Sequence, residues 1–149
     1  MKVYLASSWK NEDAVLEMQR YLRSYEFEVD AFCNPDGRFV FNIHEITPDI
    51  RKLNPRTFLE YEKTKRAFEE DRKYIDWCDC LIMLQSCGNS SHLEAGYAKG
   101  KGKTLIIFYP EGFPAEGGLD VMYGFADLIT QDVYDVIDYL KGGKEWREQ

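Results

Sequence analysis

Hydrophobic positions along the chain fall into short apolar runs separated by longer amphipathic segments. The run near residue 105, Thr-Leu-Ile-Ile-Phe-Tyr, is almost wholly apolar, which is typical of a strand in the middle of a parallel sheet. Four other runs have the length and composition of strands. Two of them are continuous apolar runs, as expected for buried strands, and one alternates between apolar and acidic residues. The five predicted strands cover residues 2–7, 26–32, 79–85, 103–109 and 128–130.

Helical spacing fills most of the intervals between these runs. Pro55 stands near the start of a long charged segment, and Asn11 and Thr130 precede apolar residues at helical spacing, as capping residues do. Alternation of strands and helices favours an α/β fold with right-handed crossovers. We therefore expect a three-layer sandwich, with a five-stranded parallel Rossmann/flavodoxin-like sheet and helices on both faces. The predicted helices cover residues 12–22, 55–77, 91–99, 122–126 and the segment after 130.

Residues 33–54 fit neither pattern. They contain the turn signal Asn-Pro-Asp-Gly, followed by alternating Phe39, Phe41 and Ile43. The segment is longer than an ordinary α/β connection, and loops of that length often have a function. Three interpretations stay open for it: a lid, an extra hairpin or a substrate-facing loop.

Composition narrows the class of protein. At 149 residues, with 44% hydrophobic and 30% charged residues, the chain is expected to form one globular domain, 1–149, with a loose polar tail at 142–149. A net charge of −7 argues against a non-specific nucleic-acid partner. No apolar stretch approaches the roughly 20 residues of a membrane span, and the N-terminus reads as a strand, so no membrane association and a cytoplasmic location are expected. The four cysteines are expected to be reduced.

The turn between the third predicted strand and the next helix carries the main candidate for chemistry. Ser91-His-Leu-Glu94 matches the capping-box pattern, which by itself gives Glu94 a purely structural role. However, the turn before it, Cys-Gly-Asn-Ser-Ser, is small enough for a ligand to approach the backbone. The helix dipole would also keep Glu94 ionised, as a carboxylate nucleophile requires. We therefore take Glu94 as a candidate nucleophile.

A second carboxylate is needed for that interpretation. Glycosyl transfer with retention uses two carboxyl groups about 5 Å apart, one attacking the anomeric carbon and the other handling the leaving group's proton. Asp71, Asp76 and Asp79 lie just before the strand that leads into the turn. Asp71 and Asp76 are the candidates, and their spacing does not decide between them.

Four stretches, taken in order, resemble one family. The strongest is Leu93-Glu-Ala-Gly-Tyr-Ala98, followed by Gly102-Lys-Thr-Leu-Ile-Ile. The others are Lys2-Val-Tyr-Leu-Ala-Ser-Ser-Trp9, the Asp71 to Asp79 segment, and Asp120-Val-Met122 with Gly124 and Asp127. Together they resemble the nucleoside 2-deoxyribosyltransferases and the related nucleotide N-glycosidases. The resemblance covers most of the chain except residues 33–54 and the tail.

The resemblance implies an enzyme that cleaves the N-glycosidic bond of a nucleoside or nucleotide. Glu94 would attack C1′, Asp71 would hold and protonate the departing base, and Tyr4 would position Glu94 by its hydroxyl. It also implies no cofactor and no metal, and a homo-oligomer in which Asp120 and Met122 reach into a neighbouring subunit's site. The candidate substrate-binding residues are Ser7, Trp9, Gly88, Asn89, Ser90, Ser91, His92, Asp120 and Met122.

Two departures from the family pattern concern the substrate. Gly88 stands where the transferases have Asp and the nucleotide hydrolases have Ser, and Asp120 stands where Asn is expected. The stretch from Asn89 to His92 could receive a phosphate at a helix N-terminus, whereas a carboxylate at Asp120 would repel one. The 5′ group therefore stays open.

The sequence also leaves the type of reaction open. Sugar transfer to a second base and hydrolysis differ only in which acceptor is better placed. Two rival hypotheses are a TIR-like NAD glycohydrolase and a non-catalytic nucleotide-binding module. Cys78, Cys80, Cys87 and His92 raise the possibility of zinc, but their spacing and the apolar strand around Cys80 favour buried thiols.

Overall fold

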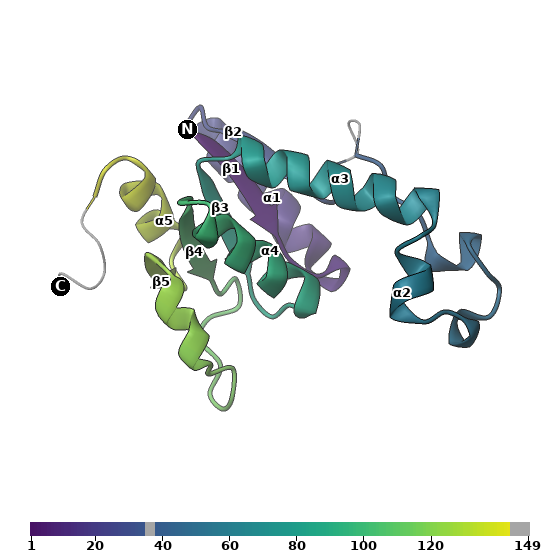
Figure 1. The fold of residues 1–149 in the computed structure, drawn as a ribbon. Helices are drawn as coiled ribbons and strands as arrows, with labels where there is room; N and C mark the ends of the chain where they lie inside the picture. The colour runs from purple at the N-terminus through teal and green to yellow at the C-terminus, as the bar shows by residue number, and fades with distance from the viewer. Residues whose placement is uncertain (35–37, 144–149) are drawn as a thin grey trace.

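A five-stranded parallel sheet forms the centre of the computed structural model, which describes residues 1–34 and 38–143 (Figure 1). The strand order is β2-β1-β3-β4-β5, and every neighbouring pair is parallel. All five predicted strands are confirmed, most of them shorter than predicted. Their bounds are β1 Lys2–Ala6, β2 Glu28–Ala31, β3 Cys80–Leu84, β4 Thr104–Phe108 and β5 Leu128–Thr130.

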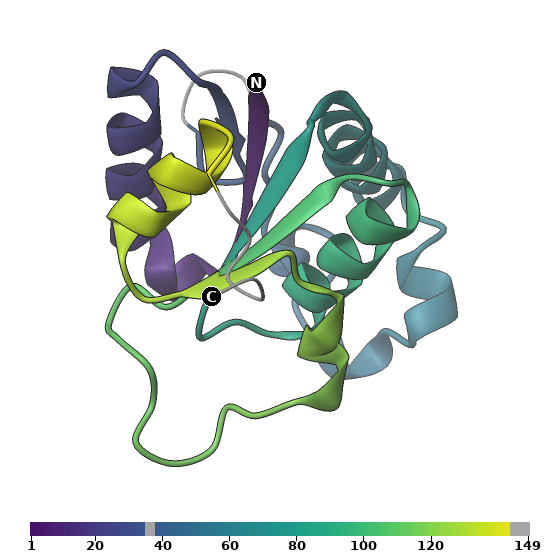
Figure 2. The same ribbon diagram turned by 90° about the vertical axis from the view of Figure 1, so that its left-hand side faces the viewer.

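Helices cover both faces of this sheet, so the predicted three-layer α/β architecture is confirmed. Figure 2 shows α1 and α5 on one side of the sheet and α3 and α4 on the other. Because the chain crosses from one side of β1 to the other, the strand order reverses between β1 and β3. The helix bounds are α1 Glu12–Ser24, α2 Pro55–Phe58, α3 Glu62–Trp77, α4 Asn89–Gly100 and α5 Val133–Leu140.

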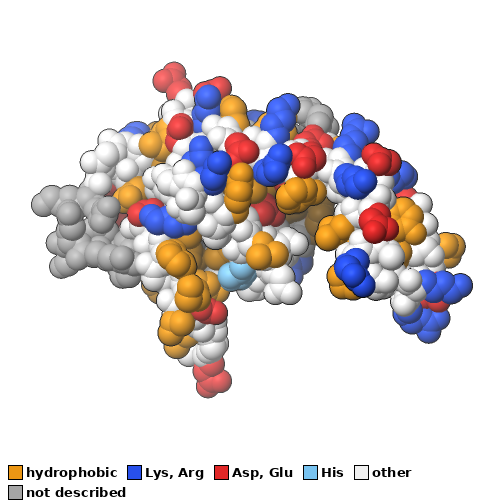
Figure 3. All heavy atoms as spheres, in the orientation of Figure 1, with side chains coloured by type: hydrophobic (Ala, Val, Ile, Leu, Met, Phe, Trp, Pro, Cys, Tyr) orange, Lys and Arg blue, Asp and Glu red, His pale blue; other side chains and the backbone are white. Residues whose placement is uncertain are grey.

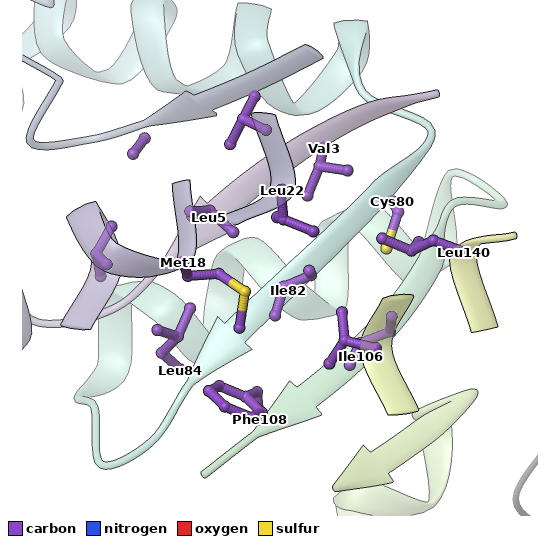
Figure 4. Packing of buried hydrophobic residues seen from close by; sticks show 14 of the residues in the cluster. Val3, Leu5, Met18, Leu22, Cys80, Ile82, Leu84, Ile106, Phe108 and Leu140 are labelled. Carbon is purple, nitrogen blue, oxygen red and sulfur yellow. The ribbon is translucent and has the colours of Figure 1, made fainter. Parts of the chain in front are cut away.

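Alternate residues of the buried strands build two separate cores. Val3 and Leu5 of β1 face α1 and α5, in the core shown in Figure 4. Tyr4 and Ala6 of the same strand face α3 and α4. Successive side chains of a strand point to opposite faces, so a central strand needs apolar residues on both. Tyr4 differs from the other core residues of β1 because it carries a polar group. Its ring is buried among apolar residues, and its hydroxyl makes a hydrogen bond to a side chain of α4.

Two predicted helix boundaries are wrong. The helix expected over 55–77 is divided into α2 and α3, because Phe58 packs against Phe41 instead of the sheet and the chain is extended at Tyr61. The last helix is capped by Asp132, whose side chain accepts from the Tyr134 N–H, and not by Thr130.

The segment 33–54 is described at residues 33, 34 and 38–54, where it contains no strand, so the hairpin interpretation is wrong. Its regular structure consists of two short 3-10 turns, η2 (Ile43–Glu45) and η3 (Ile50–Lys52). Phe39 stacks on Phe41, with the Arg66 guanidinium 3.9 Å from the Phe39 ring centroid. In Figure 1 most of this segment lies with α2 beyond the far end of α3, away from the sheet.

The tail predicted to be loose lies outside the described residues from 144 onward. In the parts of the chain that the structure describes, no helix combines the length and the apolar character needed to cross a bilayer.

Candidate active site

The loops that follow β1 and β3 meet at the point where the strand order reverses. In open α/β sheets this is where a crevice forms and where ligands bind. Side chains of the first loop fasten it to the second: Ser7 Oγ donates to the Leu84 carbonyl (2.9 Å), and Ser8 Oγ accepts from the Gly88 N–H (3.1 Å). Asn11, expected as a helix cap, instead donates its side-chain N–H to the Ser86 carbonyl (2.7 Å). Ser7 therefore has a structural role in the loop that frames the crevice.

Glu94 lies on α4, the helix that follows the β3 loop, but at a different position in that helix from the one predicted. Because α4 begins at Asn89, Glu94 is in its second turn and is not the partner of an N-terminal cap. The capping-box interpretation is therefore wrong, and Ser91 is buried within the first turn. Glu94 Oε2 instead accepts a hydrogen bond of 2.6 Å from Tyr4 Oη.

The environment of Glu94 favours its protonated form. Burial raises the pKa of Glu94 to about 7; Asp71 also raises it, whereas the Tyr4 hydrogen bond and Arg38 lower it. This corrects the prediction that the helix dipole keeps the carboxyl ionised. Near neutral pH the group is divided between a carboxylate, which can attack, and a carboxylic acid, which cannot.

The neighbouring cavity distinguishes between the two candidate partners of Glu94. Asp71 and Glu94 line the same cavity, of about 280 Å³, between α3 and α4. Asp76 accepts instead from Tyr97 Oη (2.6 Å) on the exposed surface, and Asp79 accepts from the Lys2 N–H at the start of β1. The other lining residues are Phe68, Arg72, Ile75, Ser90, Leu93 and Tyr97. The geometry therefore pairs Asp71 with Glu94.

Arg38 is a residue of the site that the sequence did not indicate. Its side chain is 3% exposed, and Nη1 lies 2.6 Å from Asp30 Oδ2 while Nη2 forms an ion pair with Asp71. The guanidinium also lies 4.6 Å from the centroid of the Tyr74 ring. Arg38 belongs to the irregular segment 33–54 and to no motif, so neither periodicity nor the family resemblance could single it out.

The N-terminus of α4 presents polar groups next to Glu94. Asn89 and Ser90 are exposed, and a Cβ at Gly88 would meet no atom within 4 Å. His92 is held between its own helix and the segment before β5: Nδ1 lies 2.7 Å from the Gly88 carbonyl oxygen and Nε2 lies 3.0 Å from Tyr123 Oη. Tyr123 also accepts from Gln85 Nε2 (2.7 Å), so it links three parts of the site and was missed by the sequence reasoning.

Trp9, Asp120 and Met122 do not line the cavity that contains the two carboxylates. Trp9 is half exposed and packs edge-on against Phe32, with ring centroids 4.9 Å apart. Asp120 and Met122 lie on the exposed segment that contains η4 (Val121–Phe125), where Asp120 Oδ1 accepts from the Met122 N–H (2.8 Å). Neither of them lines the cavity of their own chain between α3 and α4.

The cysteines are free thiols, and three of the four are buried. Burial raises the pKa of the Cys78 thiol to about 11, which makes it a poor metal ligand. Within residues 1–34 and 38–143, no three His, Cys, Asp or Glu side chains come close enough together to hold a metal ion.

Two solved structures share this architecture over nearly the whole chain. A 2-deoxyribosyltransferase from the psychrotolerant bacterium Bacillus psychrosaccharolyticus aligns with a TM-score of 0.66 and 19% identity, covering 93% of this chain and 92% of that one. The CMP N-glycosidase of Clostridium botulinum aligns with a TM-score of 0.56 and 17% identity, covering 95% and 99%. The chain has the fold of these enzymes. They are of the two kinds that the sequence motifs resemble, whereas no family model and no curated protein matches by sequence.

Proposed function

We propose that the protein cleaves the N-glycosidic bond of a nucleoside or nucleoside 5′-monophosphate through a covalent glycosyl ester on Glu94. The observation that carries this proposal is that Glu94, a half-buried carboxyl held by Tyr4, lines the same small cavity as Asp71. Two carboxyl groups on one cavity suit a displacement in two steps. The fold shared with a deoxyribosyltransferase and a CMP N-glycosidase supports the same class of reaction.

In the first step an ionised Glu94 oxygen attacks C1′ of the sugar. The new C–O bond forms as the C1′–N bond breaks, and the electron pair of that bond goes to the base nitrogen. Asp71 gives the base a proton; burial raises the pKa of Asp71, which favours the protonated form that this role needs. Tyr4 keeps the Glu94 carboxylate oriented by its hydrogen bond.

In the second step an acceptor attacks C1′ and releases the Glu94 carboxylate. The acceptor, either a second base or water, loses its proton to Asp71, which restores the starting state. Glu94, Asp71 and Tyr4 perform both steps without a cofactor or metal. The two outcomes, transfer and hydrolysis, depend on which acceptor the cavity holds next to the glycosyl ester.

The substrate would enter at the crevice between the β1 and β3 loops. Asn89 and Ser90, which are exposed at the start of α4, would contact the sugar or its 5′ group, and Gly88 would leave room for it. Trp9 offers an aromatic edge next to the same loop.

We also propose that two or more copies of the chain complete each other's sites. The segment between β4 and β5 exposes apolar side chains to solvent, with Leu119 93% and Val121 91% exposed, and Figure 3 shows hydrophobic side chains gathered on this projection. Exposed apolar surface of this kind is typical of a protein interface. The cavity between α3 and α4 is bordered by exposed Phe68 and Leu93 and offers an apolar surface that the projection of another copy could cover. Asp120 and Met122 would then reach a neighbour's substrate.

A substrate panel tests the proposed reaction. Deoxynucleosides, ribonucleosides, their 5′-monophosphates and NAD are incubated with the protein, with and without a free acceptor base, and base release is followed by chromatography. We expect release from at least one nucleoside or nucleotide, and a loss of about a hundredfold or more in Asp71→Asn. Asp76→Asn, on the same helix but bonded to Tyr97, is the matched control and should retain activity. NAD as the sole substrate, or no turnover at all, would contradict the proposal.

A further inference from the structure

Arg38 occupies a position that its local sequence does not explain. It comes from the irregular segment between β2 and α2, yet its side chain is 3% exposed and lies among groups from three other elements. Burying a guanidinium is costly unless carboxylates compensate for it. Here two carboxylates do so, Asp30 from β2 and Asp71 from α3.

These two carboxylates differ in one respect. Asp30 is 8% exposed, and it is the neighbour of Tyr4 across the β1–β2 pair. Asp71 is 41% exposed and lines the cavity that contains Glu94. One end of the guanidinium is therefore anchored inside the fold, and the other end binds the carboxyl group that faces the substrate.

We propose that Arg38, anchored by Asp30, is a positioning residue that fixes the Asp71 carboxyl group opposite Glu94. This inference rests on the proposed function. It adds one residue to that function, and it gives a structural reason for the buried ion pair of Arg38 and Asp30. A guanidinium has N–H donors in a planar fork, so it can bind two carboxylates at once in a fixed geometry. A lysine could supply the charge but not the fork.

The charge of Arg38 also matters when Asp71 gives its proton to the departing base. The product of that transfer is a second carboxylate on the cavity, and the Arg38 guanidinium forms an ion pair with it. Arg38 lowers the pKa of both Asp71 and Glu94, against the opposite effect of burial. Removing it should therefore leave both groups protonated to higher pH. The charged and titratable groups that face Asp71 are Tyr4 from β1, Asp30 from β2, Arg38, Glu70 of α3 and Glu94 of α4.

A double variant separates this role from simple neutralisation of Asp30. Arg38→Met alone would leave Asp30 buried without its partner, and the fold itself could fail. Arg38→Met combined with Asp30→Asn removes both charges and leaves no unpaired buried ion. If Arg38 serves only Asp30, this double variant should behave as the wild type does. If Arg38 positions Asp71, it should still lose activity.

Three readouts are compared between the wild type and the double variant. They are kcat on the best substrate of the panel, the pH profile of kcat/KM, and the pH titration of the assigned Asp71 side-chain carboxyl carbon by NMR. The matched control is Arg51→Met with Asp49→Asn, an exposed arginine–aspartate pair in the same segment that makes no contact with the site. Arg38→Lys, which keeps the buried charge, gives a second test if the double variant does not fold.

We expect the double variant to lose about tenfold to a hundredfold in kcat, with the acidic limb of its profile and the Asp71 titration both moved to higher pH. Arg38→Lys should recover part of the loss, and the control should match the wild type. Wild-type values of kcat, profile and titration in the double variant would overturn the inference. If the wild type turns over no substrate, the proposed function fails, and the Asp71 titration still decides whether Arg38 controls that carboxyl group.

Discussion

Tyr4 Oη donates a hydrogen bond of 2.6 Å to Glu94 Oε2, joining the first strand of the sheet to the helix that follows β3. The tyrosine ring is fully buried, and the carboxyl group lies at the edge of a cavity. Burial raises the pKa of Tyr4 well above its usual range, so its hydroxyl stays protonated and can donate across the pH range in which Glu94 titrates. The bond stabilises the ionised form of Glu94 and holds one of its two carboxyl oxygens, Oε2.

Replacing Tyr4 by Phe removes this bond without shortening the ring. Because the bond lowers the pKa of Glu94, its loss should raise that pKa above about 7, and the acidic limb of the rate profile should move to higher pH. We expect activity to fall by about tenfold at pH 6 and by less at pH 8.5. Steady-state rates across pH 5–9 measure this. Tyr134→Phe, at an exposed position of α5, is the control. A uniform loss at every pH would mean that Tyr4 acts only through packing.

The raised pKa of Glu94 also has a consequence for stability. Its pKa is about 7 in the folded chain against 4.5 for a free glutamate, so the folded state binds more protons between these values. By linkage, protonated Glu94 adds to the free energy of unfolding. This stabilisation is fully present below about pH 4.5 and is lost as pH rises through about 7, and its upper limit is about 3 kcal/mol.

Glu94→Gln tests this linkage because its side chain cannot ionise. Compared with the wild type, the variant should unfold at a higher urea concentration at pH 8 and at a similar concentration at pH 5. Glu17→Gln on the exposed face of α1 is the control and should show no such difference. Equal urea midpoints for Glu94→Gln and wild type at pH 8 would show that Glu94 is not destabilised by its surroundings.

Shared sites can be tested by mixing two inactive variants. In a dimer, Glu94→Gln combined with Asp120→Ala in the other copy leaves one intact site, made from the normal Glu94 of one copy and the normal Asp120 of its partner. Random pairing should restore about a quarter of the wild-type activity. Activity is measured after the two proteins are unfolded together and refolded, and each variant refolded alone serves as the control. A mixture no more active than its components would place Asp120 outside the neighbour's site.

The sheet could be predicted because each strand is recognisable from the apolar pattern of its own few residues. Short apolar runs such as 103–109 bury both faces of a strand wherever they lie, and the strand–helix alternation then fixes a parallel arrangement. Helix ends were harder to predict because they depend on tertiary contacts. The break between α2 and α3 follows from the packing of Phe58 on Phe41, a contact with a segment whose sequence pattern predicted no defined element.

The site was predictable to the extent that residues belong to motifs. Tyr4, Asp71 and Glu94 were singled out by the family resemblance. In the structure Asp71 and Glu94 line one cavity, and buried Tyr4 donates a hydrogen bond to Glu94. The spacing of Ser91 and Glu94 predicted a capping role for Glu94 that is wrong, because a Ser-x-x-Glu spacing does not show where the helix begins. Arg38 and Tyr123 could not be found, since both act through contacts that join distant parts of the chain.

The central claim is that Glu94 forms a bond to the sugar, and trapping that bond tests it most directly. The protein is incubated with a nucleoside fluorinated at the 2′ carbon, which slows release of the glycosyl ester, and is then analysed by intact mass and peptide mapping. We predict a mass increase of one fluorinated glycosyl group, located on Glu94 and absent in Glu94→Gln. A label on another residue, or wild-type turnover by Glu94→Ala, would contradict the account.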